Sequence, residues 1–218
     1  QPLLLDELLD PRRLYSPLRS SELQAELRSL LEALGDDDLE QEMERLRQFA
    51  QGNRLRVAAA DIVGAIPLMV VSDYLTEIAE VTLQQVQASA WRDLTRKYGR
   101  PGDLGDMDTG FAVIGYGKLG GIELGYASDL DLVFLHGSAN FNAVTDGRRS
   151  VANDVFYARM GQRVIHMLTT RTPSGLLYEA DMRLRPNGNS GQLVASLNTF
   201  EKYQLSDAWT WEHQALAR

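Results

Sequence analysis

A glycine-rich stretch, Gly115 to Gly121, followed closely by the acidic pair Asp129 and Asp131, constrains this chain more than any other feature. The apolar residues 111–114 predict a strand that ends at the glycines, and a second apolar strand is predicted at 130–135. Side chains on a strand alternate between its faces, so two aspartates at i and i+2 point the same way, with Cα atoms roughly 6.5 Å apart. Paired carboxylates suit hard divalent cations, which also hold phosphates. The pattern is typical of nucleotidyl or phosphoryl transfer.

The same glycines fit a second pattern, the dinucleotide-binding fingerprint G-x-G-x-x-G. That fingerprint requires an acidic residue about 20 positions further on, at the end of the next strand, to hold the ribose. Counting from Gly120 leads to Asn140, which lies beyond the predicted strand. The acids instead stand at the start of that strand, so we do not favour a dinucleotide site.

A predicted strand at 176–184 carries a second set of charged residues. Tyr178, Ala180, Met182 and Leu184 share one face, and the opposite face carries Glu179, Asp181, Arg183 and Arg185. A solvated outer face is the alternative interpretation. We favour a ligand site, because the loop at 186–191 is rich in glycine and asparagine, which lets backbone N–H groups approach a ligand.

Gly120 and Gly121 precede a predicted helical turn at 122–124. Glycines leave the N–H groups at the start of a helix unobstructed, and that end of a helix favours an anion. The glycine pair is therefore a candidate phosphate contact.

Charge and composition exclude several classes of function. The chain has 218 residues, a net charge of −8, 44% hydrophobic residues and no cysteine. An acidic chain is a poor nucleic-acid binder, because that affinity depends on Lys and Arg. No apolar run reaches the length of a membrane span, so we expect no membrane partner. Without cysteine there are no disulfides or thiolate sites, which fits a cytoplasmic location.

The fold class expected from the pattern is α+β, a helical region at 1–107 followed by a core at 108–218 with a small mixed sheet. Helices are predicted from Ser20 to Gly35, after Asp36–Asp38, at 55–62 and at about 72–98. In the second half, strands are predicted at 111–115, 130–135, 176–184 and 192–196. The helices predicted there lie at 151–168, 199–205 and 208–217.

Three strings of this sequence resemble the glutamine synthetase adenylyltransferases, members of the DNA polymerase beta-like nucleotidyltransferase superfamily. They are GYGKLGGIELGYASDLDLVFLH, LLYEADMRLRPNGNSGQLVAS and YQLSDAWTWEHQALAR. LLDELLDP and RVAAADIVG resemble the helical segment that precedes the signature, so the resemblance covers nearly the whole chain. It implies a polymerase beta-like core and a further helical region after residue 218.

The resemblance also implies roles for individual residues. Asp129, Asp131 and Asp181 fall on the family's catalytic, metal-binding carboxylates, which hold Mg²⁺, and ATP is the substrate. Gly120 and Gly121 replace a Gly-Ser turn, so phosphate contacts there must come from the backbone. The candidate nucleotide contacts are Gly120, Gly121, Ser128, Lys118, Arg183 and Arg185.

Family members carry two related halves, one that attaches AMP to a tyrosine of glutamine synthetase and one that removes it. The tyrosine of GYGKLGG, the SDLDLVFLH strand and the AWTWEHQAL ending resemble the attaching half more closely. The resemblance implies glutamine synthetase as protein substrate and, for the longer enzyme, a PII-type signal protein as a further partner. Two alternatives stay open: the removing half, or a docking and regulatory module without catalysis.

Overall fold

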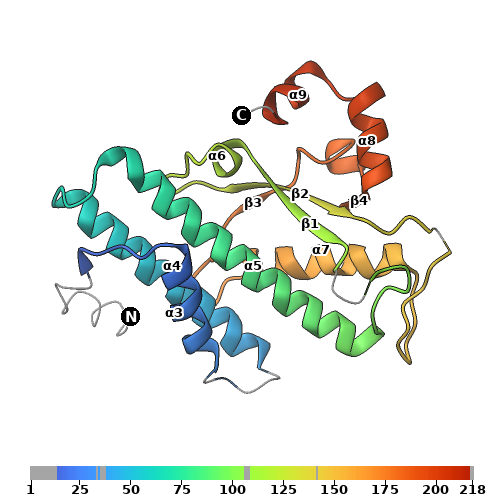
Figure 1. Ribbon diagram of the computed structural model, residues 1–218, viewed down its shortest axis with the longest axis horizontal. Helices are drawn as coiled ribbons and strands as arrows, with labels where there is room; N and C mark the ends of the chain where they lie inside the picture. Colours follow the sequence, from blue (N-terminus) through green and yellow to red (C-terminus); the bar gives the residue numbers. More distant parts are fainter. Residues whose placement is uncertain (1–13, 33, 35–37, 106–108, 141, 217–218) are drawn as a thin grey trace. The chain divides into compact units, whose positions relative to one another are not determined.

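The computed structural model describes residues 14–32, 34, 38–105, 109–140 and 142–216. Its elements are labelled in Figure 1. Contacts divide the chain into two units. The first comprises Gln1–Gln85, Ile122–Ser128 and Met167–Glu179, and the second comprises Val86–Gly121, Asp129–His166 and Ala180–Arg218. These bounds follow contacts, not chain order, and the predicted division at residue 107 stays a prediction.

The first unit is mainly helical. It contains α3 (Ser20–Glu32), α4 (Leu39–Ile62), η1 (Leu68–Val70) and the first half of α5 (Val71–Tyr98). Asp38 caps α4 by accepting a hydrogen bond of 2.9 Å from the N–H of Gln41, as expected for an acid at a helix start. The predicted helix end at Gly35, and Asp36 and Asp37, lie outside the described residues.

The prediction of a separate helix at 55–62 is wrong, because α4 runs unbroken from Leu39 to Ile62. Gly52 and Asn53, both weak helix formers, are buried within this helix. The Asn53 amide donates a hydrogen bond of 3.1 Å to the carbonyl of Phe49, one turn back. Burial and this local bond outweigh the weak helix preference of the two residues.

The second unit is built on a small mixed sheet. β1 (Phe111–Tyr116) pairs antiparallel with β2 (Leu130–His136), so that Tyr116 lies opposite Asp131. On its other side β2 pairs in parallel with two short strands in succession. These are β3 (Ala180–Asp181), opposite the start of β2, and β4 (Val194–Ser196), opposite its end. The mixed sheet after a helical region confirms the predicted α+β class.

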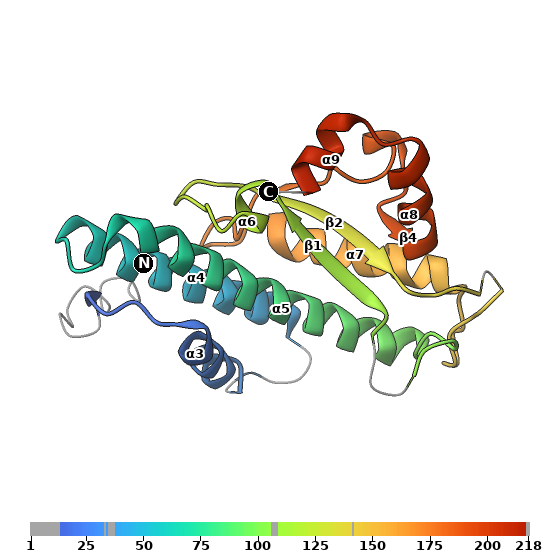
Figure 2. The same ribbon diagram turned by 45° about the horizontal axis from the view of Figure 1, so that its top comes forward.

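The two faces of β2 pack differently. One face joins Tyr116, Val133, Leu135 and Ala195 in a buried cluster, against which Ile114, Leu184 and Phe200 pack. Phe200 belongs to α8 (Leu197–Ser206), which is followed by α9 (Thr210–Leu216); Figure 2 shows this pair next to β2 and β4. On α7 (Asn153–Thr169), a Cβ at Gly161 would lie 2.6 Å from Val194 and 3.1 Å from Phe134. Helix α7 therefore packs closely against β2 and β4.

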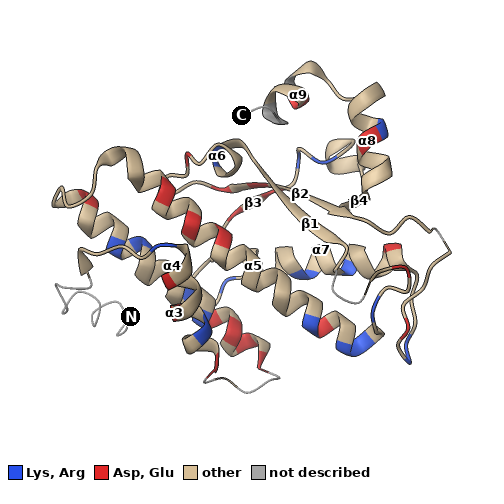
Figure 3. Ribbon diagram, viewed as in Figure 1, with Lys and Arg blue, Asp and Glu red and all other residues tan. Residues whose placement is uncertain are grey.

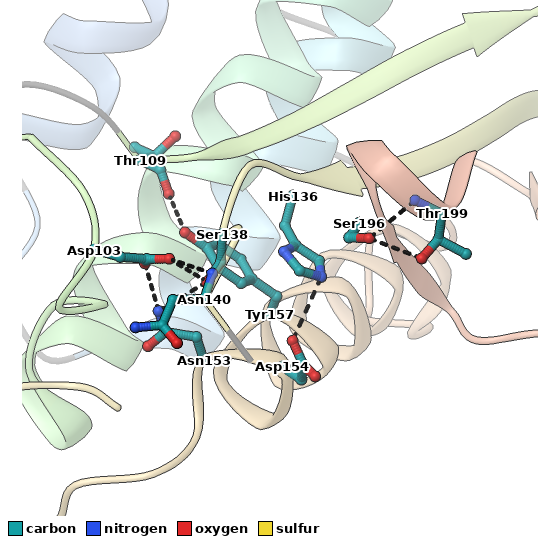
Figure 4. Close-up of polar contacts among 10 residues, drawn as sticks. All are labelled: Asp103, Thr109, His136, Ser138, Asn140, Asn153, Asp154, Tyr157, Ser196 and Thr199. Carbon is teal, nitrogen blue, oxygen red and sulfur yellow. Dashed lines mark hydrogen bonds and ion pairs between the residues drawn. The ribbon is translucent and has the colours of Figure 1, made fainter. Parts of the chain in front are cut away.

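Polar side chains form a network of contacts at the end of β2 (Figure 4). Asp103 accepts hydrogen bonds from Ser138 Oγ at 2.6 Å and from Asn153 Nδ2 at 2.6 Å. The buried ring of His136 stacks on Tyr157, with ring centroids 4.8 Å apart. Burial lowers the pKa of His136, and the charges of Asp154 and Asp103 only partly oppose this. His136 is therefore held as a neutral packing residue.

The third strand is much shorter than predicted. Only Ala180 and Asp181 pair with β2, and the chain leaves the sheet at Met182. The strand predicted at 176–184 is therefore wrong outside Ala180 and Asp181. The turn that follows needs left-handed backbone, with φ of 61° at Asn187 and 53° at Gly188. In the part of the chain that the structure describes, no helix has the length and apolar character required to cross a membrane.

Candidate functional site

Three carboxylates converge at the start of β2. Asp129 directly precedes the strand, Asp131 is its second residue, and Asp181 lies opposite Asp131 on β3. An oxygen from each carboxylate lies within 4.8 Å of the others. In Figure 3 the acidic start of β2 and β3 run side by side, followed by basic residues in the loop after β3. The structure thus brings together the three acids that the sequence proposed.

The surroundings of these acids shift the pKa values of two of them in opposite directions. Partial burial raises the pKa of Asp131, and the negative charges of Asp129 and Asp181 add to this. By contrast, hydrogen bonds from Arg183 lower the pKa of Asp181. Three carboxylates held this close repel one another, and a divalent cation would relieve that repulsion. The donor set consists of oxygen atoms, as Mg²⁺ prefers, so the residues present fit this ion.

The glycine turn supplies the space that Asp131 needs. Gly117 has φ of 55°, in the left-handed region, and a Cβ there would overlap Oδ2 of Asp131. A Cβ on Gly120 would lie 2.6 Å from the carbonyl oxygen of Gly115. The sequence singled out Gly120 and Gly121 and gave Gly117 no role. The signal was present, because a glycine directly after a strand marks a close backbone approach.

The predicted helical turn at 122–124 is wrong. The short helix α6 instead comprises Gly117–Gly120, and the N–H of Gly121 bonds to the carbonyl of Gly117 at 2.9 Å. Ile122 has φ of 57°, in the left-handed region, so a right-handed helix cannot continue through it. Gly120 and Gly121 therefore close a helical turn and do not open one, so neither lies at the start of a helix, where free N–H groups favour an anion.

The basic candidates differ in their surroundings. Lys118 is exposed on α6, and its positive charge partly opposes the rise in the pKa of Asp131. Arg183 is exposed and bonds to Asp181 through Nε at 2.7 Å. Arg185 is half-buried and donates from Nη1 to the carbonyl of Met182 at 2.6 Å. These three stay candidates for binding phosphate.

Ser128 has a local partner. Its hydroxyl accepts a hydrogen bond of 3.0 Å from the N–H of Gly125, and its own N–H donates to the Gly125 carbonyl at 3.2 Å. Contacts assign this residue to the first unit, whereas the carboxylates belong to the second. Its predicted contact with a nucleotide stays a prediction.

Comparisons with known proteins show the family of this chain. The profile of the glutamate–ammonia ligase adenylyltransferase family matches residues 1–218. The chain is 58% identical to the bifunctional glutamine synthetase adenylyltransferase/adenylyl-removing enzyme of Thioalkalivibrio sulfidiphilus, over 100% of its length and 23% of that protein. It is 57% identical to the protein of the same name from Hahella chejuensis and 56% identical to that from Pseudomonas putida. The chain spans less than a quarter of each of these relatives, at 23%, 23% and 22% of their lengths. By sequence, then, this chain belongs to the glutamate–ammonia ligase adenylyltransferase family.

Proposed function

We propose that this chain carries the catalytic centre that transfers AMP from ATP to a tyrosine hydroxyl of glutamine synthetase and releases pyrophosphate. The convergence of Asp129, Asp131 and Asp181 beside the glycine turn is the observation that carries the proposal. The names of the relatives supply the substrate class, since they act on glutamine synthetase by adenylylation.

Asp129 and Asp131 would hold Mg²⁺ together with Asp181, and the bound ions would neutralise the charge that develops on the attacking and leaving oxygens. The tyrosine oxygen attacks the α-phosphorus, and the bond from that phosphorus to the bridging oxygen of pyrophosphate breaks. Free tyrosine has a pKa of about 10, so its proton needs an acceptor, and Asp181 is the candidate. Lys118, Arg183 and Arg185 offer positive charge to the triphosphate.

The relatives are bifunctional, so removal of AMP by phosphorolysis at the same carboxylates is the second candidate. The two reactions differ in their products. Attachment releases pyrophosphate, whereas removal consumes phosphate and yields ADP. The PII-type partner and the cytoplasmic location stay expectations from the family resemblance.

The test is incubation of the chain with ATP labelled at the α-phosphate, Mg²⁺ and glutamine synthetase, followed by mapping of AMP-tyrosine. Asp131→Asn should abolish labelling. Glu201→Gln, which neutralises an exposed carboxylate on α8, should leave it unchanged. Labelling that survives in folded Asp131→Asn protein would refute the assignment. Binding of glutamine synthetase without any nucleotide turnover would favour the docking alternative.

A further inference from the structure

Arg183 engages both oxygens of Asp181. Its backbone N–H donates to Oδ1 at 2.8 Å, and its Nε donates to Oδ2 at 2.7 Å. Its Nη2 pairs with the same Oδ2. The third carboxylate of the site is therefore already occupied by a cation of the chain itself.

No comparable ion pair to Asp129 or Asp131 is found among the described residues. A divalent cation needs the same lone pairs that the Arg183 guanidinium takes from Oδ2, and its charge is repelled by that guanidinium. The two cations therefore compete for Asp181.

The Arg183 side chain can leave without disturbing the fold. It is 75% exposed, whereas that of Asp181 is 14% exposed. The backbone bond from the Arg183 N–H to Oδ1 holds the carboxylate in place whichever way the side chain turns. An arginine fork released beside a triphosphate can bind phosphate oxygens in a bidentate way.

From this geometry we infer that Arg183 is an exchange residue: it pairs with Asp181 until Mg²⁺ takes the carboxylate, and then binds the phosphates of the nucleotide. The inference rests on the proposed function and adds a step to it. It also separates two arginines that the sequence treated alike. Arg185 is half-buried and its guanidinium donates a hydrogen bond to the Met182 carbonyl, which fixes the position of the guanidinium.

The first test measures Mg²⁺ binding by calorimetry in the absence of nucleotide. Arg183→Met should bind Mg²⁺ about two- to tenfold more tightly than the unchanged chain, the range expected for loss of an exposed ion pair and a repelling charge. Arg183→Lys, which keeps the charge but not the fork, should fall between the two. Arg148→Met removes one exposed arginine of the same unit and should leave the affinity unchanged.

A weaker or unchanged Mg²⁺ affinity in Arg183→Met would overturn the exchange, because it would mean that Arg183 orients Asp181 as a ligand or has no influence on it. The second test measures binding of a non-hydrolysable ATP analogue at saturating Mg²⁺. Here Arg183→Met should bind about tenfold more weakly, since one charge-assisted phosphate contact is lost. Unchanged affinity for the analogue would overturn the second step.

These outcomes are separable from failure of the proposed function. If Asp131→Asn binds Mg²⁺ as well as the unchanged chain does, the carboxylates are not a metal site, and both proposals fall. If Asp131→Asn loses Mg²⁺ binding while Arg183→Met does not gain it, only the exchange falls. Circular dichroism of each variant checks that it is folded.

Discussion

Replacement of Arg47 by methionine should destabilise the first unit strongly. Arg47 has no exposed surface, yet its guanidinium has no carboxylate partner among the ion pairs found in the described residues. It donates instead to backbone carbonyls: Met43 at 2.7 Å, Gly175 at 2.9 Å, Met167 at 3.0 Å, and Thr170. One side chain of α4 thereby holds the segment that follows α7.

The magnitude follows from two opposing effects. A hydrogen bond from a charged donor contributes about 1.5–3 kcal/mol, so four give about 6–12 kcal/mol. Burial of the guanidinium costs several kcal/mol, and methionine, which keeps most of the apolar stem, avoids that cost. We expect a net loss of about 3–6 kcal/mol, a large fraction of the stability of a typical domain.

Urea unfolding followed by circular dichroism measures this loss. Arg28→Met, at an exposed position of α3, is the matched control and should change the free energy of unfolding by less than about 0.5 kcal/mol. Arg47→Lys should destabilise the unit at least as much as methionine, because one ammonium stays buried and cannot reach four carbonyls. A loss below about 1 kcal/mol in Arg47→Met would refute the reasoning, since it would mean that the four bonds merely balance the burial of the charge.

Three further results are expected. Gly117→Ala should abolish Mg²⁺ binding in calorimetry, because the new methyl overlaps Oδ2 of Asp131, whereas Gly52→Ala, with nothing near its added Cβ, should raise the free energy of unfolding by about 0.5–1 kcal/mol. Asp181→Asn should lose AMP transfer but keep part of its ATP binding; equal loss of both would indicate a general metal role. The pKa of His136 is lowered by burial in the folded state, so its contribution to stability is present above the ordinary pKa of about 6.5 and declines as the pH falls below it. Urea midpoints between pH 8 and pH 5 should show this decline, and a flat profile would contradict it.

The sheet was predictable where apolar runs are long and flanked by glycine. β1 and β2 extend only one residue beyond the predicted ranges, at Tyr116 and His136. The alternation of apolar and charged residues at 176–184 led to a wrong prediction, because it implied one continuous strand. In the structure Leu177 and Tyr178 are buried among helices of the first unit, and only Ala180 and Asp181 reach the sheet. Periodicity describes which residues are buried, but not against what.

The candidate site was predictable as a set of residues but not as a set of contacts. The spacing of Asp129 and Asp131 predicted that their side chains point the same way, and the family resemblance added Asp181 to the site. Neither could reveal that Gly117 makes room for a carboxylate, because that overlap depends on a backbone angle set by the closure of α6. Nor could they show which arginine is exposed, since burial of Arg185 depends on the turn after β3.

The pairing of β2 with two short strands in succession affects how this site can vary. Between them, residues 182–193 leave the sheet and return. Insertions or deletions in that excursion would shift Arg183 and Arg185 relative to Asp181, while β2 keeps its hydrogen bonds to β1 and β4. The segment that carries the two arginines can therefore vary between homologues without disturbing the strand on which Asp131 stands.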